Sequence, residues 1–132
     1  MTTLTINSKL QSEMIEITAQ VRDAIVASGV VSGIALVYTP HTTAAITINE
    51  NADPDVTIDM VKAMDKLIPH EDGYRHLEGN SAAHIKSSLF GASVQLIVDQ
   101  GQPVLGTWQG VYFCEFDGPR RSRQVHIQVI GQ

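Results

Sequence analysis

Residues 32–49, SGIALVYTPHTTAAITIN, decide the fold class. The first half, residues 32–39, is a continuous apolar run that predicts a buried β-strand. Pro40 ends this strand because proline cannot donate a hydrogen bond within a sheet. Residues 44–49 are rich in β-branched side chains and predict the next strand. The centre of the chain is therefore predicted to be β-structure, with His41 on the bend between two strands.

Strands are also predicted on both sides of this centre, at residues 2–7, 14–18, 93–99, 104–108, 111–116 and 124–130. A helix is predicted to begin after Thr18, which serves as its N-cap, and to stop at Gly29. A second helix begins at Asp53-Pro54, because aspartate caps a helix and proline fits its first position. Because strands outnumber helices and do not alternate regularly with them, the sequence favours an α+β fold.

Two helix faces can be predicted from the spacing of apolar residues. The second helix has an apolar stripe made of Val56, Met60, Met64 and Leu67. A short third helix, residues 81–89, is predicted to turn Ile85 and Leu89 toward the core. Ser87 and Ser88 then fall on the same side as His84.

The composition is that of one ordinary domain, residues 1–132. Only 17% of the residues are charged, which suggests that part of the surface is covered by another subunit. A net charge of -5 excludes a general basic surface for nucleic acid. The single cysteine, Cys114, fits a reducing compartment. No apolar segment resembles a signal peptide or a membrane span, so we expect a cytoplasmic protein without a membrane partner.

The five histidines differ in their setting. Alternation places His126 on the polar face of its strand, and His70 follows Pro69 in a polar loop, so both are predicted to lie at the surface. His41 lies at a strand end beside two threonine hydroxyls. It serves either a functional site or the fold alone, where a neighbouring carbonyl would satisfy it.

His76 and His84 bracket the segment HLEGNSAAH. Gly79 allows a tight turn there, and Asn80 or Ser81 caps the short helix, whose free amides favour an anion such as phosphate. The two histidines, with His41 as a third ligand, also fit a divalent metal such as Mg²⁺ or Zn²⁺, although their spacing is not a standard zinc signature.

Glu115 stands in a strand, residues 111–116, that is apolar on both faces. A carboxylate is costly in such a place unless it is paired or functional. One interpretation is a structural ion pair with an arginine such as Arg120. The other is a catalytic or metal-directed carboxylate beside an arginine that binds phosphate.

Four segments together resemble the YjbQ family, which is also described as the secondary thiamine-phosphate synthase family. They are HTTAAITINENADPDV from His41, HLEGNSAAHIKSSLFG from His76, GTWQGVYFCEFDGPRR from Gly106, and the early helix that ends in Ser28-Gly29. The resemblance runs from about Met14 to Ile130. It implies one α+β domain with a β-sandwich-like core and a homotrimer. It also implies a polar pocket near the subunit boundaries, lined by His41, His76, His84 and Glu115.

The resemblance further implies a weak thiamine-phosphate synthase activity, a transfer that joins a pyrimidine diphosphate to a thiazole phosphate and releases pyrophosphate. In this hypothesis the substrate-binding residues are Thr42, Asn80, Ser81, Lys86 and Arg120, and Glu115, His84 and His41 are the catalytic candidates. Two alternatives stay open. One is a metal-dependent hydrolase of a phosphorylated metabolite, and the other is a non-catalytic trimer that binds a small molecule or a metal.

Overall fold

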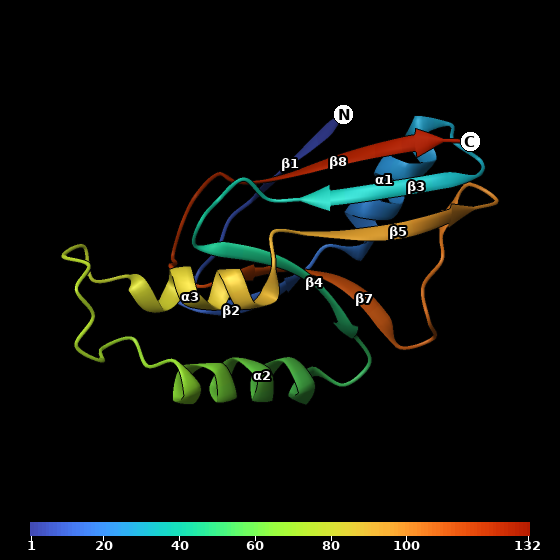
Figure 1. The fold of residues 1–132 in the computed structure, drawn as a ribbon. Helices are drawn as coiled ribbons and strands as arrows, with labels where there is room; N and C mark the ends of the chain where they lie inside the picture. The colour runs from blue at the N-terminus through green and yellow to red at the C-terminus, as the bar shows by residue number, and fades with distance from the viewer.

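The computed structural model describes residues 1–132 and contains two antiparallel β-sheets (Figure 1). The larger sheet has the strand order β1 (Thr2–Ile6), β8 (Arg123–Gly131), β3 (Gly33–Tyr38), β5 (Ser93–Asp99) and β6 (Gln102–Pro103). The smaller sheet has the order β2 (Glu13–Glu16), β7 (Gln109–Glu115) and β4 (Ala44–Glu50). The two strands predicted from residues 32–49 are therefore present as β3 and β4, and each belongs to a different sheet.

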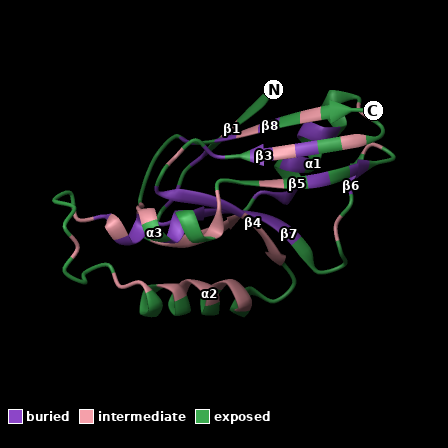
Figure 2. Cartoon of the chain, viewed as in Figure 1, coloured by how far each residue is buried: buried purple, intermediate pink, exposed green.

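Three helices complete the fold: α1 (Thr18–Ser28), α2 (Pro54–Leu67) and α3 (Ser81–Phe90). The main core of 15 buried residues lies between the two sheets and α1. A second cluster of 5 buried residues lies on the opposite face of the smaller sheet, against α3 (Figure 2). This arrangement confirms the α+β class and the sandwich-like core. None of the helices is long and apolar enough to cross a membrane.

The helix ends follow the local sequence closely. Gly29 adopts the left-handed conformation at φ 73°, which glycine reaches without steric cost, and its amide closes α1. Asp53 accepts a hydrogen bond from the amide of Asp55, and Pro54 is the first residue of α2. One predicted cap is wrong. Thr18 lies inside the helix, and its hydroxyl donates to Glu16 and accepts from the amide of Val111.

The predicted strand at residues 104–108 is absent, because this segment bends into a turn. The amide of Gln109 donates to the carbonyl of Gly106 at 3.0 Å, and the Gln109 side chain accepts from the amide of Gly106 at 2.8 Å. The turn brings the chain from β6 in the larger sheet to β7 in the smaller sheet. The segment between β6 and β7 is therefore a crossover between sheets.

The predicted core face of α3 is also wrong. Ile85 is 40% exposed and Leu89 is 66% exposed, whereas the buried residues of this helix are Ala82, Ala83, Lys86 and Ser87. Small side chains let α3 approach the smaller sheet closely. On α2, Val56, Met60 and Met64 are half-buried as predicted, but Leu67 at the end of the stripe is exposed.

Candidate functional site

A cavity of about 530 Å³ lies between the loop that joins β3 to β4 and one face of α3. The loop contributes His41 and Thr42, and the helix contributes His84, Ser87 and Ser88. These three helix residues lie at i, i+3 and i+4, so they share one face. None of the lining residues is an aspartate, glutamate, lysine or arginine. The cavity is therefore lined by imidazoles and hydroxyls together with uncharged apolar and aromatic side chains, among them Tyr38, Pro40 and Ala44.

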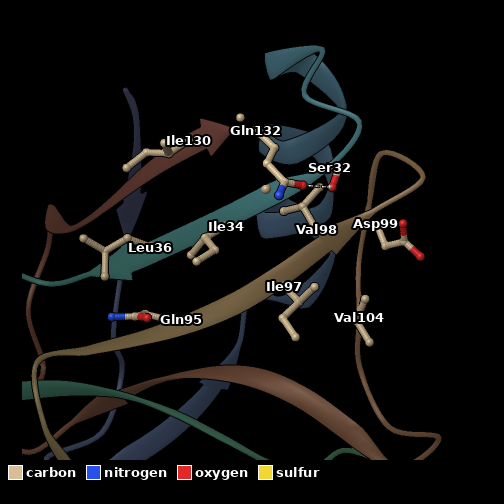
Figure 3. A pocket seen from close by; sticks show the side chains of 12 residues that line it. Ser32, Ile34, Leu36, Gln95, Ile97, Val98, Asp99, Val104, Ile130 and Gln132 are labelled. Carbon is tan, nitrogen blue, oxygen red and sulfur yellow. Dashed lines mark hydrogen bonds between the residues drawn. The ribbon is translucent and has the colours of Figure 1, made fainter.

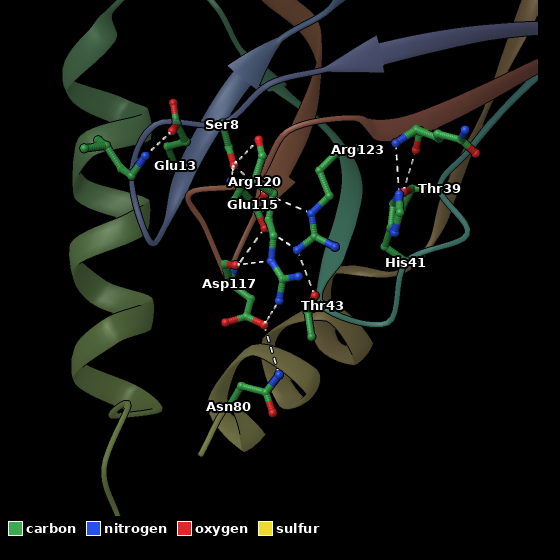
Figure 4. A network of polar contacts seen from close by, with 12 residues as sticks. Ser8, Glu13, Thr39, His41, Thr43, Asn80, Glu115, Asp117, Arg120 and Arg123 are labelled. Carbon is green, nitrogen blue, oxygen red and sulfur yellow. Dashed lines mark hydrogen bonds and ion pairs between the residues drawn. The ribbon is translucent and has the colours of Figure 1, made fainter. Parts of the chain in front are cut away.

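His41 is held at this cavity by the neighbouring strand β8. Its Nε2 accepts a hydrogen bond from the amide of Gln124 at 2.9 Å (Figure 4). Burial lowers the pKa of His41 below its usual value, and the charge of Arg123 lowers the pKa further, while Glu115 acts in the opposite direction. The ring is accordingly neutral at pH 7.

The three histidines that were predicted to hold a metal are brought together only in part. The rings of His76 and His84 meet edge to face, with centroids 5.5 Å apart, and His84 and His41 border the same cavity. No group of three or more His, Cys, Asp or Glu side chains in the chain could hold a metal ion. Because Nε2 of His41 already accepts from Gln124, the three histidines of one chain do not fit a metal site.

Glu115 lies outside the cavity, in a buried polar network (Figure 4). Its side chain is 0% exposed and accepts from Nε and Nη2 of Arg123, from the Ser8 hydroxyl at 2.6 Å and from the amide of Asp117 at 3.1 Å. Burial would raise the pKa of Glu115, but the hydrogen bonds from Arg123, Ser8 and Asp117, with the Arg123 charge, lower it. Both carboxylate oxygens of Glu115 are therefore engaged by groups of the chain itself.

The partner of Glu115 is Arg123, and the predicted partner, Arg120, forms an ion pair with Asp117 instead. Nη2 of Arg123 also donates a hydrogen bond to the hydroxyl of Thr43 at 2.8 Å. Thr43 directly follows His41 and Thr42 in the loop. The buried pair therefore fixes β7, β8 and the base of that loop. These contacts favour the structural interpretation of Glu115, and its catalytic role stays a prediction.

Most of the residues predicted to contact an anion bind carboxylates of the chain instead. Lys86 is 4% exposed and binds Asp65 of α2. Asn80 donates to the carboxylates of Glu78 and Asp117, which places negative charge next to the start of α3 at Ser81. An anion is disfavoured there. Among the five predicted substrate-binding residues, only Thr42 borders the cavity.

Sequence reasoning placed Ser87 on the His84 face but did not include it among the site residues. Ser87 is buried, and its hydroxyl oxygen has no hydrogen-bond partner in the chain. It borders the same cavity as His41 and His84. The helical spacing from His84 was the available signal. The two histidines predicted to lie at the surface serve the fold, since His126 bonds Thr3 and His70 bonds Gln11.

Known proteins share this fold over its whole length. The family described as UPF0047 protein YjbQ-like matches residues 2–132. The chain is 55% identical over 130 residues to the UPF0047 protein YugU of Bacillus subtilis, covering 98% of this chain and 98% of that protein. It is 52% identical over 126 residues to a UPF0047 protein of Methanocaldococcus jannaschii, covering 96% of this chain and 91% of that one.

Solved structures agree with this relationship. An uncharacterized conserved protein of the YjbQ/UPF0047 family from Clostridium acetobutylicum has a TM-score of 0.96 and 51% identity, over 98% of this chain and 100% of that chain. A YbjQ-like protein of unknown function from Sulfolobus solfataricus has a TM-score of 0.96 at 29% identity, over 99% of this chain and 96% of that chain. The chain belongs to the YjbQ-like UPF0047 family.

Proposed function

We propose that the cavity between the β3–β4 loop and α3 binds a phosphorylated small molecule. The observation that carries this proposal is the Ser87 hydroxyl, which is buried without a partner beside His41 and His84. A buried polar group without a hydrogen bond costs about 1–3 kcal/mol, so native proteins rarely retain one without a reason. A bound ligand with hydrogen-bond acceptors would satisfy it. The cavity volume of about 530 Å³ lies within the range that is usual for small-molecule binding sites.

The reaction proposed for this cavity is a weak thiamine-phosphate synthase activity. The bond between the pyrimidine methylene carbon and the diphosphate breaks, and pyrophosphate leaves with the electron pair. The thiazole nitrogen then forms a bond to that carbon with its lone pair, and no proton has to be removed. The site would therefore work by positioning the two substrates and stabilising the departing pyrophosphate. His84 and Ser87 are in place to do this as hydrogen-bonding groups.

The test is an assay for thiamine phosphate with both substrates present. Ser87→Ala and His84→Asn should each lower the rate at least about tenfold, since each removes a hydrogen-bonding group from the cavity. Ser93→Ala is the matched control, because Ser93 is exposed on β5 and lies outside the cavity. Formation of thiamine phosphate at the same rate by all three variants would show that the reaction does not use this cavity.

We also propose that the protein assembles as a homotrimer through the outer face of the larger sheet. This face exposes the apolar side chains of Ile34, Ile97 and Ile130, with Val104 at its edge, around an open hollow of about 700 Å³ (Figure 3). Apolar patches of this kind are typical of protein interfaces. Light scattering across a dilution series should give three times the chain mass. A monomer mass at every concentration would contradict the trimer.

The two alternatives make different predictions. A metal-dependent hydrolase requires ligands from outside this chain, because one chain contains no group of three or more His, Cys, Asp or Glu side chains that could hold a metal ion. Metal analysis of untagged protein decides this point. A non-catalytic trimer would bind phosphorylated metabolites, and its melting temperature would rise on binding, without turnover. We also propose that the protein is located in the cytoplasm.

A further inference from the structure

The contact between His41 and Gln124 fixes which ring nitrogen carries the hydrogen. The backbone amide of Gln124 is a donor, and it points at Nε2 of His41 with a distance of 2.9 Å. A donor can bond only to a ring nitrogen that has no hydrogen. Nε2 is therefore the bare nitrogen, and the neutral ring carries its hydrogen on Nδ1. No atom of the chain accepts a hydrogen bond from this Nδ1, and the ring borders the cavity.

The surroundings of His41 keep this arrangement in place. The charged and titratable groups around it are Arg123, Glu115, Arg120 and His126, and three of these four disfavour a second proton on the ring. A proton on Nε2 would also destroy the hydrogen bond from Gln124. Nε2 of His41 is therefore engaged, and Nδ1–H is the hydrogen-bonding group that the ring has left to offer a ligand.

Ser87 supplies a second donor on the opposite wall of the cavity. The residue is 7% exposed, and its buried hydroxyl oxygen has no hydrogen-bond partner in the chain. A small rotation of this side chain would turn its O–H toward a ligand in the cavity that it borders. The hydroxyls of Thr42 and Ser88 border the same space. Neither a carboxylate nor a lysine or arginine is among the lining residues, so the cavity offers a ligand hydrogen bonds and no carboxylate that would repel an anion. A set of donors without a fixed negative charge suits an oxyanion.

We propose that this cavity contains an oxyanion subsite in which Nδ1–H of His41 and Oγ–H of Ser87 donate hydrogen bonds to a phosphoryl group. The proposal rests on the proposed function and deepens it. Lys86, Arg120 and Asn80 at the start of α3 are engaged with carboxylates. Neutral donors would therefore bind the anion in their place. A subsite of neutral donors holds the phosphoryl group mainly by directed hydrogen bonds, and attraction between opposite charges contributes little.

The first test needs no ligand. Two-bond ¹H–¹⁵N correlation spectra of the histidine rings distinguish a nitrogen that carries hydrogen from a bare one. At pH 7.5 the hydrogen of His41 should be on Nδ1. A hydrogen on Nε2 would overturn the subsite, whatever the protein binds.

The second test uses pyrophosphate as the probe and two substitutions of His41, each of which keeps a polar atom near the position of only one of the two ring nitrogens. His41→Asn places an amide N–H near the position of Nδ1, whereas His41→Gln places an acceptor near the position of Nε2 and provides no donor at Nδ1. Calorimetric titration should show that His41→Asn binds pyrophosphate about tenfold more tightly than His41→Gln, since a hydrogen bond to a charged group is worth about one order of magnitude in affinity. Ser87→Ala should weaken binding by a similar factor, while Ser93→Ala should not.

The outcomes separate the subsite from the proposed function. If pyrophosphate shifts the amide signals of Thr42 and Ser88 but His41→Gln binds it as tightly as His41→Asn, the subsite is wrong and the cavity remains the functional site. If wild-type protein forms thiamine phosphate but pyrophosphate shifts no signal in the cavity, the subsite is also wrong. Thermal unfolding of every variant at one protein concentration shows that each binding result refers to folded protein.

Discussion

Replacement of Glu115 by glutamine tests whether the buried network is structural. Glu115 and Arg123 are 0% and 5% exposed, so Glu115→Gln leaves a guanidinium buried without an opposite charge. Breaking a buried ion pair in this way costs about 3–5 kcal/mol. For a domain of this size each kcal/mol lowers the melting temperature by roughly 3–5 °C, so Tm should fall on the order of 10–20 °C.

The assay is thermal unfolding followed by circular dichroism at one fixed protein concentration, because assembly makes Tm depend on concentration. Arg120→Gln is the matched control. It breaks the Arg120–Asp117 pair, whose arginine is 49% exposed, and exposed pairs contribute only about 0–1 kcal/mol. A loss of stability in Glu115→Gln no larger than that in Arg120→Gln would refute the structural role. Unchanged stability with lost activity would return Glu115 to a chemical role.

Three further predictions follow from neighbouring features. The pKa of Glu115 is lowered in the fold, so its stabilising contribution is present above the unfolded pKa of about 4.3 and is lost as pH falls through the lower folded value. The free energy of unfolding measured in urea should therefore fall more over this pH range for wild type than for Glu115→Gln. Gly118→Ala should destabilise the fold by about 1–3 kcal/mol or more, because its Cβ would lie 2.0 Å from the carbonyl oxygen of Leu10, and a melting temperature equal to wild type would contradict that packing. Burial raises the pKa of the Cys114 thiol to about 12, so a thiol reagent should react with Cys114 only after unfolding; rapid labelling of native protein would show that β7 is accessible.

Features with a local cause could be predicted from the sequence. The end of α1 at Gly29 and the start of α2 at Asp53-Pro54 depend on backbone conformation and capping within a few residues, and both are confirmed. The strands around residues 32–49 follow from continuous apolar and β-branched runs. The crossover near Gly106 could not be predicted, because residues 104–108 resemble a strand until the two sheets are known.

Features that depend on distant partners could not be predicted. Helical periodicity divides α3 into two faces, but hydrophobicity selects the wrong one, since Lys86 is buried only because Asp65 of α2 neutralises it. Arg120 and Arg123 are both near Glu115 in sequence, and the choice between them is made by β8, which belongs to the other sheet. The free hydroxyl of Ser87 becomes visible only when every neighbour is in place.

The central claim is that a small phosphorylated ligand binds between the β3–β4 loop and α3. The most direct measurement is a ¹H–¹⁵N spectrum of the protein titrated with thiamine phosphate, the product of the proposed reaction. The largest signal changes should occur at Thr42, Ser87 and Ser88, which border the cavity. Changes centred instead on the separate polar hollow beside Arg22 and Asn51, or no changes at all, would contradict the claim.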